Sequence, residues 1–180
     1  MNRPAPDDSN LWVFGYGSLI YKVDFPWLQR EPAEIAGWAR RFWQGSHDHR
    51  GTPQAPGRVV TLVPQAGQRC RGMAWQVSAD TLAHLDHREK NGYERHRVSI
   101  RLLERQQTVS GLLYLAGRNN PAFLGPAPVE EMARHIAGAR GPSGTNSDYL
   151  LRLEEALHRL GDHDEHVMQL AQHVRRRLAL

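Results

Sequence analysis

The chain has 180 residues, a length that suits one domain built around one hydrophobic core. Hydrophobic residues make up 40% of the chain, which excludes a disordered polyelectrolyte. The net charge of +4 is mild and partly reflects a local cluster at Arg175–Arg177. No stripe of basic residues mixed with aromatic ones is visible, so we expect no nucleic-acid partner.

Cysteine content and the N-terminal segment both favour a soluble cytoplasmic protein. Cys70 is the one cysteine, so no internal disulfide can form, as suits a reducing compartment. Residues 1–10 are polar, lack the apolar core of a secretory signal and are expected to be disordered, which leaves one domain over residues 11–180. No apolar run approaches the length of a membrane span, so no membrane association is expected.

Strands dominate the first two-thirds of the expected structure. Leu11–Phe14 is a short apolar run typical of a buried strand, and Ala33–Gln44 is either a strand or irregular. Glycine and proline make His47–Arg58 a loop. Two further strands are expected to pair with each other across a turn at Pro64–Arg71; they are Val59–Val63 and Gly72–Val77.

Helices dominate the last third. Ser78 is a suitable N-cap for a helix from Ala79 to about Lys90, which Asn91-Gly92 ends. Strands at Tyr93–Leu103 and Val109–Ala116 follow, and then three helices are expected: one that starts near Pro128 and closes before Gly141, one from Asn146 or Ser147 to Gly161, and one from about Asp164 to Leu178.

Strands that precede helices, without alternating βαβ units, indicate an α+β fold. We expect a small, mostly antiparallel β-barrel or curled sheet with helices packed on its outside.

The segment Gly15-Tyr16-Gly17-Ser18-Leu19-Ile20 directly follows the first strand. Its two glycines permit a close approach by a ligand, and backbone N–H groups left unpaired there can receive a carboxylate or an oxyanion. The alternative is a tight turn that uses glycine only for its geometry. A dinucleotide-binding fingerprint is excluded, because its last glycine would fall at Ile20.

Glu89 shares one face of the expected helix with Leu82 and Leu85. A carboxylate on a core-facing side is costly unless it is paired or used, and burial would raise its pKa toward the range useful for proton transfer. The alternative is a glutamate at a helix end that pairs with a nearby arginine. Spacing alone leaves both interpretations open.

Other candidate sites are weaker. The sets His47-Asp48-His49 and His163-Asp164-Glu165-His166 fit no zinc-binding spacing, so no metal is expected. Cys70 has no obvious base in the local sequence, and Ser18 lacks the G-x-S-x-G context of a serine hydrolase.

Several segments together resemble the ChaC-type γ-glutamylcyclotransferases over residues 11 to 178. They include Val13–Ile20, the segment Arg40–Ser46 and the run Arg88-Glu89-Lys90 that resembles the stretch with the family's catalytic glutamate. The other matching segments are Lys22–Pro26, Asp48–Gly51, Pro56–Leu62, Gly92-Tyr93, Tyr114, Asn120-Pro121, Leu124–Pro128, Gly141–Gly144, Asn146 and Tyr149-Leu150. The chain departs from the family pattern at Tyr21, His87 and Asn91, which flank the expected site.

The resemblance implies a β-barrel with flanking helices and an enzyme that cleaves glutathione into 5-oxoproline and Cys-Gly without metal or organic cofactor. It implies that residues 15–20 hold the γ-glutamyl group, that Glu89 transfers protons, and that Tyr149 faces the substrate rather than serving only as a core residue. One of Arg40, Arg41 and Arg58 is expected to meet a substrate carboxylate, and Arg41 is the predicted contact. Two alternatives remain: a cyclotransferase for other γ-glutamyl amino acids or amines, and a catalytically silent γ-glutamyl-binding module.

Overall fold

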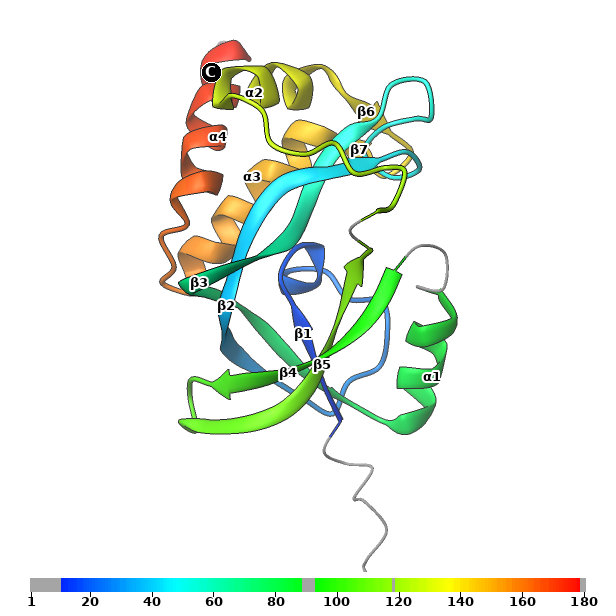
Figure 1. Cartoon of the computed structure of the whole chain (residues 1–180), viewed down its shortest axis with the longest axis vertical. Helices are drawn as coiled ribbons and strands as arrows, with labels where there is room; N and C mark the ends of the chain where they lie inside the picture. The colour runs from blue at the N-terminus through cyan, green and yellow to red at the C-terminus, as the bar shows by residue number, and fades with distance from the viewer. Residues whose placement is uncertain (1–10, 89–92, 118, 179–180) are drawn as a thin grey trace, which may run out of the picture.

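A computed structural model describes residues 11–88, 93–117 and 119–178 of the chain. Within these residues, a closed barrel forms in the order β1 (Leu11–Gly15), β3 (Gly57–Val77), β2 (Gln29–Ser46), β4 (Tyr93–Leu102) and β5 (Gln107–Ala116). Neighbouring strands are antiparallel except where β1 meets β5 in parallel and closes the barrel. The expected α+β fold with a small barrel is therefore confirmed (Figure 1).

The helices lie outside the barrel. Helix α1 (Ala79–Arg88) packs on one side of it, whereas three further helices cover the extended ends of β2 and β3 (Figure 1). The three are α2 (Val129–Gly138), α3 (Asn146–Arg159) and α4 (Glu165–Arg177). Short elements complete the described chain: the 3₁₀ turn η2 (Ser18–Ile20) and the strand pair β6 (Arg140–Gly141) and β7 (Gly144–Thr145).

Two of the helix starts follow from local side-chain chemistry. The hydroxyl of Ser78 accepts a hydrogen bond from the N–H of Thr81 at 3.2 Å, as the expected N-cap of α1 should. The carboxylate of Asp164 does the same for Val167 at the start of α4. Both caps satisfy backbone donors that the first turn of a helix leaves unpaired.

The expected hairpin across Pro64–Arg71 is wrong. Strand β3 runs continuously from Gly57 to Val77 and pairs with β2, and the connection between β2 and β3 is the loop at residues 47–56. The glycine and proline signals mark an irregularity instead: the register shifts where Trp38 pairs with Pro64, and both Gly37 and Gly67 have positive φ. A bulge uses the same residues as a turn without reversing the strand.

Three hydrophobic clusters fill the described part of the chain. Along β1, Trp12 and Phe14 point into the barrel, whereas Val13 points out toward α1. The segment after β1 contacts all three clusters. Ile20 belongs to the cluster formed mainly by α2, α3 and α4, and Leu19 packs against the cluster beside α1. Tyr16 packs against the first of these and against the cluster inside the barrel. The candidate loop is thus held at the junction of the cores.

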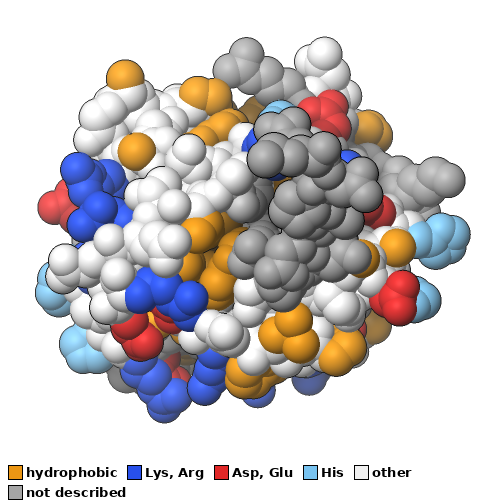
Figure 2. Space-filling view, turned by 90° about the horizontal axis from the view of Figure 1, so that it is seen from below, with side chains coloured by type: hydrophobic (Ala, Val, Ile, Leu, Met, Phe, Trp, Pro, Cys, Tyr) orange, Lys and Arg blue, Asp and Glu red, His pale blue; other side chains and the backbone are white. Residues whose placement is uncertain are grey.

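Within the described residues, none of the helices combines the length and the apolar character needed to cross a bilayer. On the face seen in Figure 2, acidic side chains lie close to basic ones at the left, and hydrophobic side chains are exposed near the centre and along the lower edge.

Asn146 joins the helices to the barrel. Its side chain is fully buried, and its amide oxygen accepts from the N–H of Arg58 while its amide nitrogen donates to the Arg58 carbonyl, both at 2.7 Å. The first residue of α3 thus completes the hydrogen bonding of one residue on β3, as an extra strand would.

We predict that Asn146→Ala lowers the free energy of unfolding by about 2 kcal/mol or more, because it leaves a buried N–H and a buried C=O unpaired. Chemical denaturation followed by circular dichroism measures this change. Ser147→Ala is the matched control, since the neighbouring Ser147 is also buried but its hydroxyl makes one long contact of 3.5 Å. Equal, small losses in both variants would contradict the prediction.

Candidate active site

The loop after β1 is compact because glycines allow its backbone to approach other atoms. A Cβ atom at Gly15 would lie 2.6 Å from the Cβ of Leu19, and one at Gly72 on β3 would lie 2.2 Å from the carbonyl oxygen of Gly15. These distances are too short for any side chain. The sequence therefore folds the loop back over the end of β1.

Four consecutive carbonyl groups of this loop are held by hydrogen bonds. The Nε–H of Arg40 donates to Tyr16 O at 2.7 Å, and the N–H of Ile20 donates to Gly17 O at 2.9 Å. The Ser18 carbonyl accepts from two following N–H groups, those of Tyr21 and Lys22. The indole of Trp75 donates to Leu19 O at 2.8 Å.

The N–H groups of the same loop are different. Among the described residues, no hydrogen bond uses the N–H of Gly17, Ser18 or Leu19 as donor. Ser18 is exposed, whereas Gly17 is buried. Fixed donors that lack a protein acceptor are what a bound carboxylate or a developing oxyanion requires. That the loop binds a substrate group through these donors stays a prediction.

Tyr149 on α3 lies against this loop. A Cβ atom at Gly17 would stand 3.1 Å from the Tyr149 hydroxyl and 2.8 Å from Cγ2 of Val60. The hydroxyl also accepts a hydrogen bond from the N–H of Val60 at 3.3 Å. Glycine at position 17 thus makes room for the phenol and β3 together.

The Tyr149 ring is buried, packs edge-on against Phe42 and has the Arg50 guanidinium over its face. Burial raises the pKa of its phenol, so it is a neutral hydrogen-bonding group at physiological pH. Tyr149 is therefore part of the core while its hydroxyl touches the loop. Contact with substrate stays a prediction.

Glu89 lies outside the described residues, but the helix that precedes it is tied to the loop. The Tyr16 hydroxyl donates to Tyr114 O at 2.6 Å, and the Tyr114 hydroxyl donates to Oδ1 of Asp86 at 2.6 Å. Asp86 is on α1 and precedes Glu89 by three residues. Leu82 and Leu85 are buried, as the expected apolar face of α1 requires.

The three candidate arginines differ in their surroundings. Arg40 is buried and engaged with protein acceptors, and Nη1 of Arg58 donates to two backbone carbonyls. Arg41 is half-buried and donates to Arg40 O at 2.7 Å and to Gln65 at 3.4 Å. It lines a polar cavity whose walls include no residue of the loop, so the structure does not bring Arg41 together with Gly15–Ile20. Its contact with substrate stays a prediction.

His166, a member of the second histidine-containing set, has a structural role. Nε2 of His166 accepts from the N–H of Phe42 at 2.9 Å, and burial lowers the pKa of His166 to about 4. Within the described residues, no three His, Cys, Asp or Glu side chains gather as metal ligands. Burial raises the pKa of Cys70 to about 11, so its thiol is protonated at neutral pH and is a poor nucleophile.

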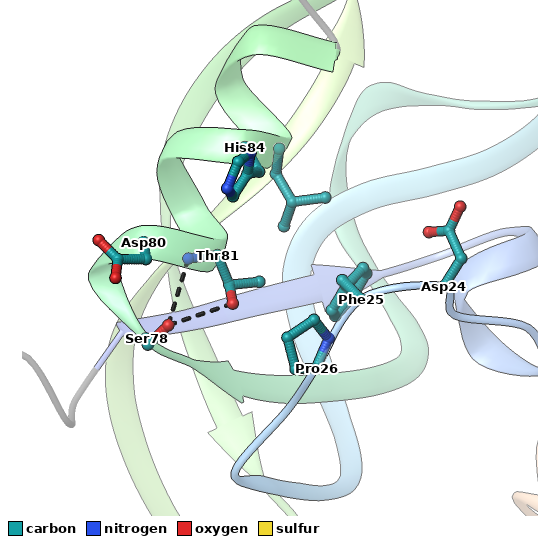
Figure 3. Close-up of a pocket in the computed structure, with 8 residues that line it drawn as sticks. Asp24, Phe25, Pro26, Ser78, Asp80, Thr81 and His84 are labelled. Carbon is teal, nitrogen blue, oxygen red and sulfur yellow. Dashed lines mark hydrogen bonds between the residues drawn. The ribbon is translucent and has the colours of Figure 1, made fainter.

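A second cavity, of about 560 Å³, lies beside α1 (Figure 3). Thr81 and His84 contribute from the helix, and Phe25 and Pro26 form part of the opposite wall. Its lining also contains no residue of the candidate loop. This cavity is therefore separate from the loop and its N–H donors.

Two features of the site could not be predicted from the sequence. The Tyr21 hydroxyl is buried without a hydrogen-bond partner among the described residues, and burial raises its pKa. The sequence shows that Tyr21 follows the loop immediately, but it does not show that the Tyr21 side chain is buried. The Tyr16–Tyr114–Asp86 connection joins residues far apart in the chain, and no local pattern signals it.

Comparison with known proteins gives consistent matches across nearly the whole chain. The family model described as "ChaC-like protein" matches residues 11–177. "Gamma-glutamylcyclotransferase 2-3" of Arabidopsis thaliana is 44% identical over 92% of this chain and 88% of its own length. "Glutathione-specific gamma-glutamylcyclotransferase 1" of Homo sapiens is 38% identical over 96% of this chain and 82% of its own length.

A solved structure agrees with these sequence matches. The crystal structure of the yeast γ-glutamylcyclotransferase specific to glutathione superimposes with a TM-score of 0.84 at 31% identity, covering 93% of this chain and 98% of that one. Fold and loop together define a γ-glutamylcyclotransferase-like barrel protein. The chain belongs to the ChaC-like family.

We predict that Gly17→Val abolishes ligand binding at the loop while the protein still folds, because the added carbons collide with Val60 and with Tyr149 and displace the free N–H groups. Calorimetric titration with glutathione, the ligand that the resemblance implies, measures the loss. Gly138→Val is the control, since a Cβ atom there meets nothing within 4 Å. A folded Gly17→Val protein with unchanged affinity would reduce the loop to a turn.

Proposed function

We propose that this protein degrades glutathione by cyclising its γ-glutamyl group, which yields 5-oxoproline and Cys-Gly. The observation that carries the proposal is the set of three adjacent backbone donors, at Gly17, Ser18 and Leu19, that have no acceptor among the described residues. Relatives named as glutathione-specific γ-glutamylcyclotransferases support the choice of substrate.

The reaction needs little beyond positioning and proton transfer. The substrate's α-amino group attacks its own γ-carbonyl carbon, a five-membered ring closes, and the bond to the cysteine nitrogen breaks. Since the attack is intramolecular, the enzyme gains most by holding the bent conformer, and well-oriented groups reach effective molarities of about 10⁵ M or more. The carbonyl oxygen gains negative charge, which backbone N–H groups can stabilise.

Glu89 is the proposed acid–base. As a carboxylate it accepts a proton from the substrate ammonium group, which frees the amine for attack, and it then delivers that proton to the departing Cys-Gly nitrogen. The attacking nitrogen releases its second proton to solvent as the ring closes and becomes the amide N–H of 5-oxoproline. The hydrogen bonds through Tyr114 support this role, because they hold α1 beside the loop three residues before Glu89.

The remaining site residues take supporting roles in this proposal. Residues 15–20 hold the γ-glutamyl group, and the neutral phenol of Tyr149 supports the loop and offers a hydrogen bond to the substrate. Arg41 is proposed to meet a substrate carboxylate. We place the activity in the cytoplasm, and the single cysteine, which cannot form an internal disulfide, supports that location.

We predict that the purified protein converts glutathione to 5-oxoproline in the presence of EDTA, at the same rate as without it. The mechanism needs a carboxylate and backbone donors and no metal. Parallel reactions with γ-glutamyl-alanine, read out as 5-oxoproline, measure selectivity. Faster turnover of γ-glutamyl-alanine would assign a different substrate, and loss of turnover in EDTA with recovery on adding a divalent ion would contradict the metal-free mechanism.

We predict that Glu89→Gln folds, binds glutathione and loses about 10²-fold or more in kcat, the usual scale for general acid–base catalysis. Glutamine keeps the shape of the side chain but cannot accept a proton at neutral pH. Thermal stability, affinity and turnover are to be measured on the same preparation.

Glu130→Gln, at an exposed position on α2, is the matched control and should retain wild-type kcat. A glutamate with a structural role gives another pattern: Glu89→Gln would lower stability while the folded fraction stayed active. That pattern, or a stable Glu89→Gln protein with near-normal turnover, would rule out the proposed acid–base.

A further inference from the structure

Arg40 on β2 is a buried cation that contacts the candidate loop directly. Its side chain is 1% exposed, although arginine is rarely buried unless it is fully paired. Its Nε–H donates to Tyr16 O at 2.7 Å, its Nη1 donates to Oδ2 of Asp164 at 2.8 Å, and its Nη2 donates to Arg71 O. Asp162 lies 3.8 Å from the same Nη1.

These contacts reach three separate parts of the fold. Tyr16 begins the loop, Arg71 is on β3, and Asp164 is the N-cap of α4. Asp164 is itself fixed, because its other oxygen accepts from the N–H of Val167. The guanidinium therefore has little freedom to turn, and the hydrogen bond to Tyr16 O has a fixed direction.

The peptide bond transmits that direction to Gly17. The Tyr16 carbonyl and the Gly17 N–H belong to one planar trans peptide unit, so they point in opposite directions. With the carbonyl turned toward Arg40, the Gly17 N–H must point away from it, on the side where no protein acceptor meets it among the described residues. A charge-assisted hydrogen bond on the carbonyl also polarises the peptide and makes its N–H a stronger donor.

We propose that Arg40 is a positioning residue, which orients and polarises the Tyr16–Gly17 peptide so that the Gly17 N–H stabilises the oxygen of the reacting γ-carbonyl. This inference rests on the proposed function and goes beyond it. Arg40 does not touch the substrate, since its nitrogens are engaged with the protein. It thus differs from an arginine that pairs with a substrate carboxylate.

The test uses Arg40→Lys, which keeps the buried positive charge beside Asp164 but loses the fork that reaches Tyr16 O and Arg71 O at the same time. We expect kcat for glutathione to fall about tenfold or more, because a misaligned donor loses most of its effect on the transition state. KM should change less than kcat. The assay temperature is set below the melting transition of every variant.

Leu170→Ala is the matched control. Leu170 is a fully buried residue of α4 and has no polar side-chain group, so its truncation destabilises the same helix while every hydrogen bond of Arg40 is kept. Its kcat should stay near the wild-type value. An Arg40→Lys protein whose kcat equals that of Leu170→Ala would overturn the positioning role.

A spectroscopic readout separates positioning from stability. The amide resonance of Gly17 in a ¹H–¹⁵N correlation spectrum should shift in Arg40→Lys and keep its position in Leu170→Ala, since the amide nitrogen responds to the hydrogen bond on the preceding carbonyl. An unshifted Gly17 resonance in Arg40→Lys would overturn the proposal. If Arg40→Lys does not fold, the same measurements are made on Arg40→Met/Asp164→Asn, which removes both charges together and keeps an N-cap side chain.

The two proposals fail separately. A wild-type protein that forms no 5-oxoproline contradicts the proposed function, and the Gly17 resonance then still decides whether Arg40 orients the peptide. Wild-type turnover together with an unaffected Arg40→Lys protein leaves the function standing and removes the role of Arg40.

Discussion

The guanidinium of Arg40 is enclosed by protein, and its burial has a large desolvation cost that only well-placed partners can offset. Those partners are two backbone carbonyls and the Asp164 carboxylate, so the loop after β1, strand β3 and the start of α4 must all meet at one point. The helix that precedes this point, α3, is itself anchored on β3 at its first residue, through Asn146. The helical layer and the barrel are therefore fixed relative to each other by buried polar contacts as well as by hydrophobic packing.

The same constraint explains the directions in which the carbonyl and N–H groups of the loop point. Its carbonyls turn toward donors in the protein interior, namely the guanidinium of Arg40, the indole of Trp75 and N–H groups of the following turn. Because each peptide unit is planar, fixing the carbonyls of Tyr16, Gly17 and Ser18 also fixes the directions of the N–H groups of Gly17, Ser18 and Leu19, which point away from those carbonyls. Gly17 permits this arrangement next to the Tyr149 hydroxyl, where a Cβ atom would not fit. In the proposed reaction, donors that the protein itself orients would avoid a reorganisation cost.

The sequence predicted those parts of the structure that local chemistry determines. Ser78 as a cap, the apolar face of α1 with Leu82 and Leu85, and the strands on either side of residues 103–106 all follow from nearest-neighbour patterns. The glycine and proline residues between Pro64 and Arg71 indicate a turn that the structure does not contain, because a bulge and a turn share their residue preferences and only the pairing partner of the strand distinguishes them. Arg40 could be identified as a candidate but not assigned to Tyr16 and Asp164, since Asp164 lies 124 residues away in the chain. Periodicity carries no information about contacts of that range.

The arrangement also couples the two halves of the proposed site through one residue. The backbone carbonyl of Tyr114 accepts a hydrogen bond from the Tyr16 hydroxyl, and the hydroxyl of Tyr114 donates one to Asp86 on α1. The carbonyl is fixed by the pairing of β4 with β5, where Tyr114 stands opposite Arg95, and Arg95 in turn forms an ion pair with Asp86 at 2.7 Å. Near its C-terminal end, α1 is therefore attached to the same barrel strands as the loop. The loop and the described part of α1 are thus held by the same pair of strands, and this pairing fixes how the two elements lie relative to each other.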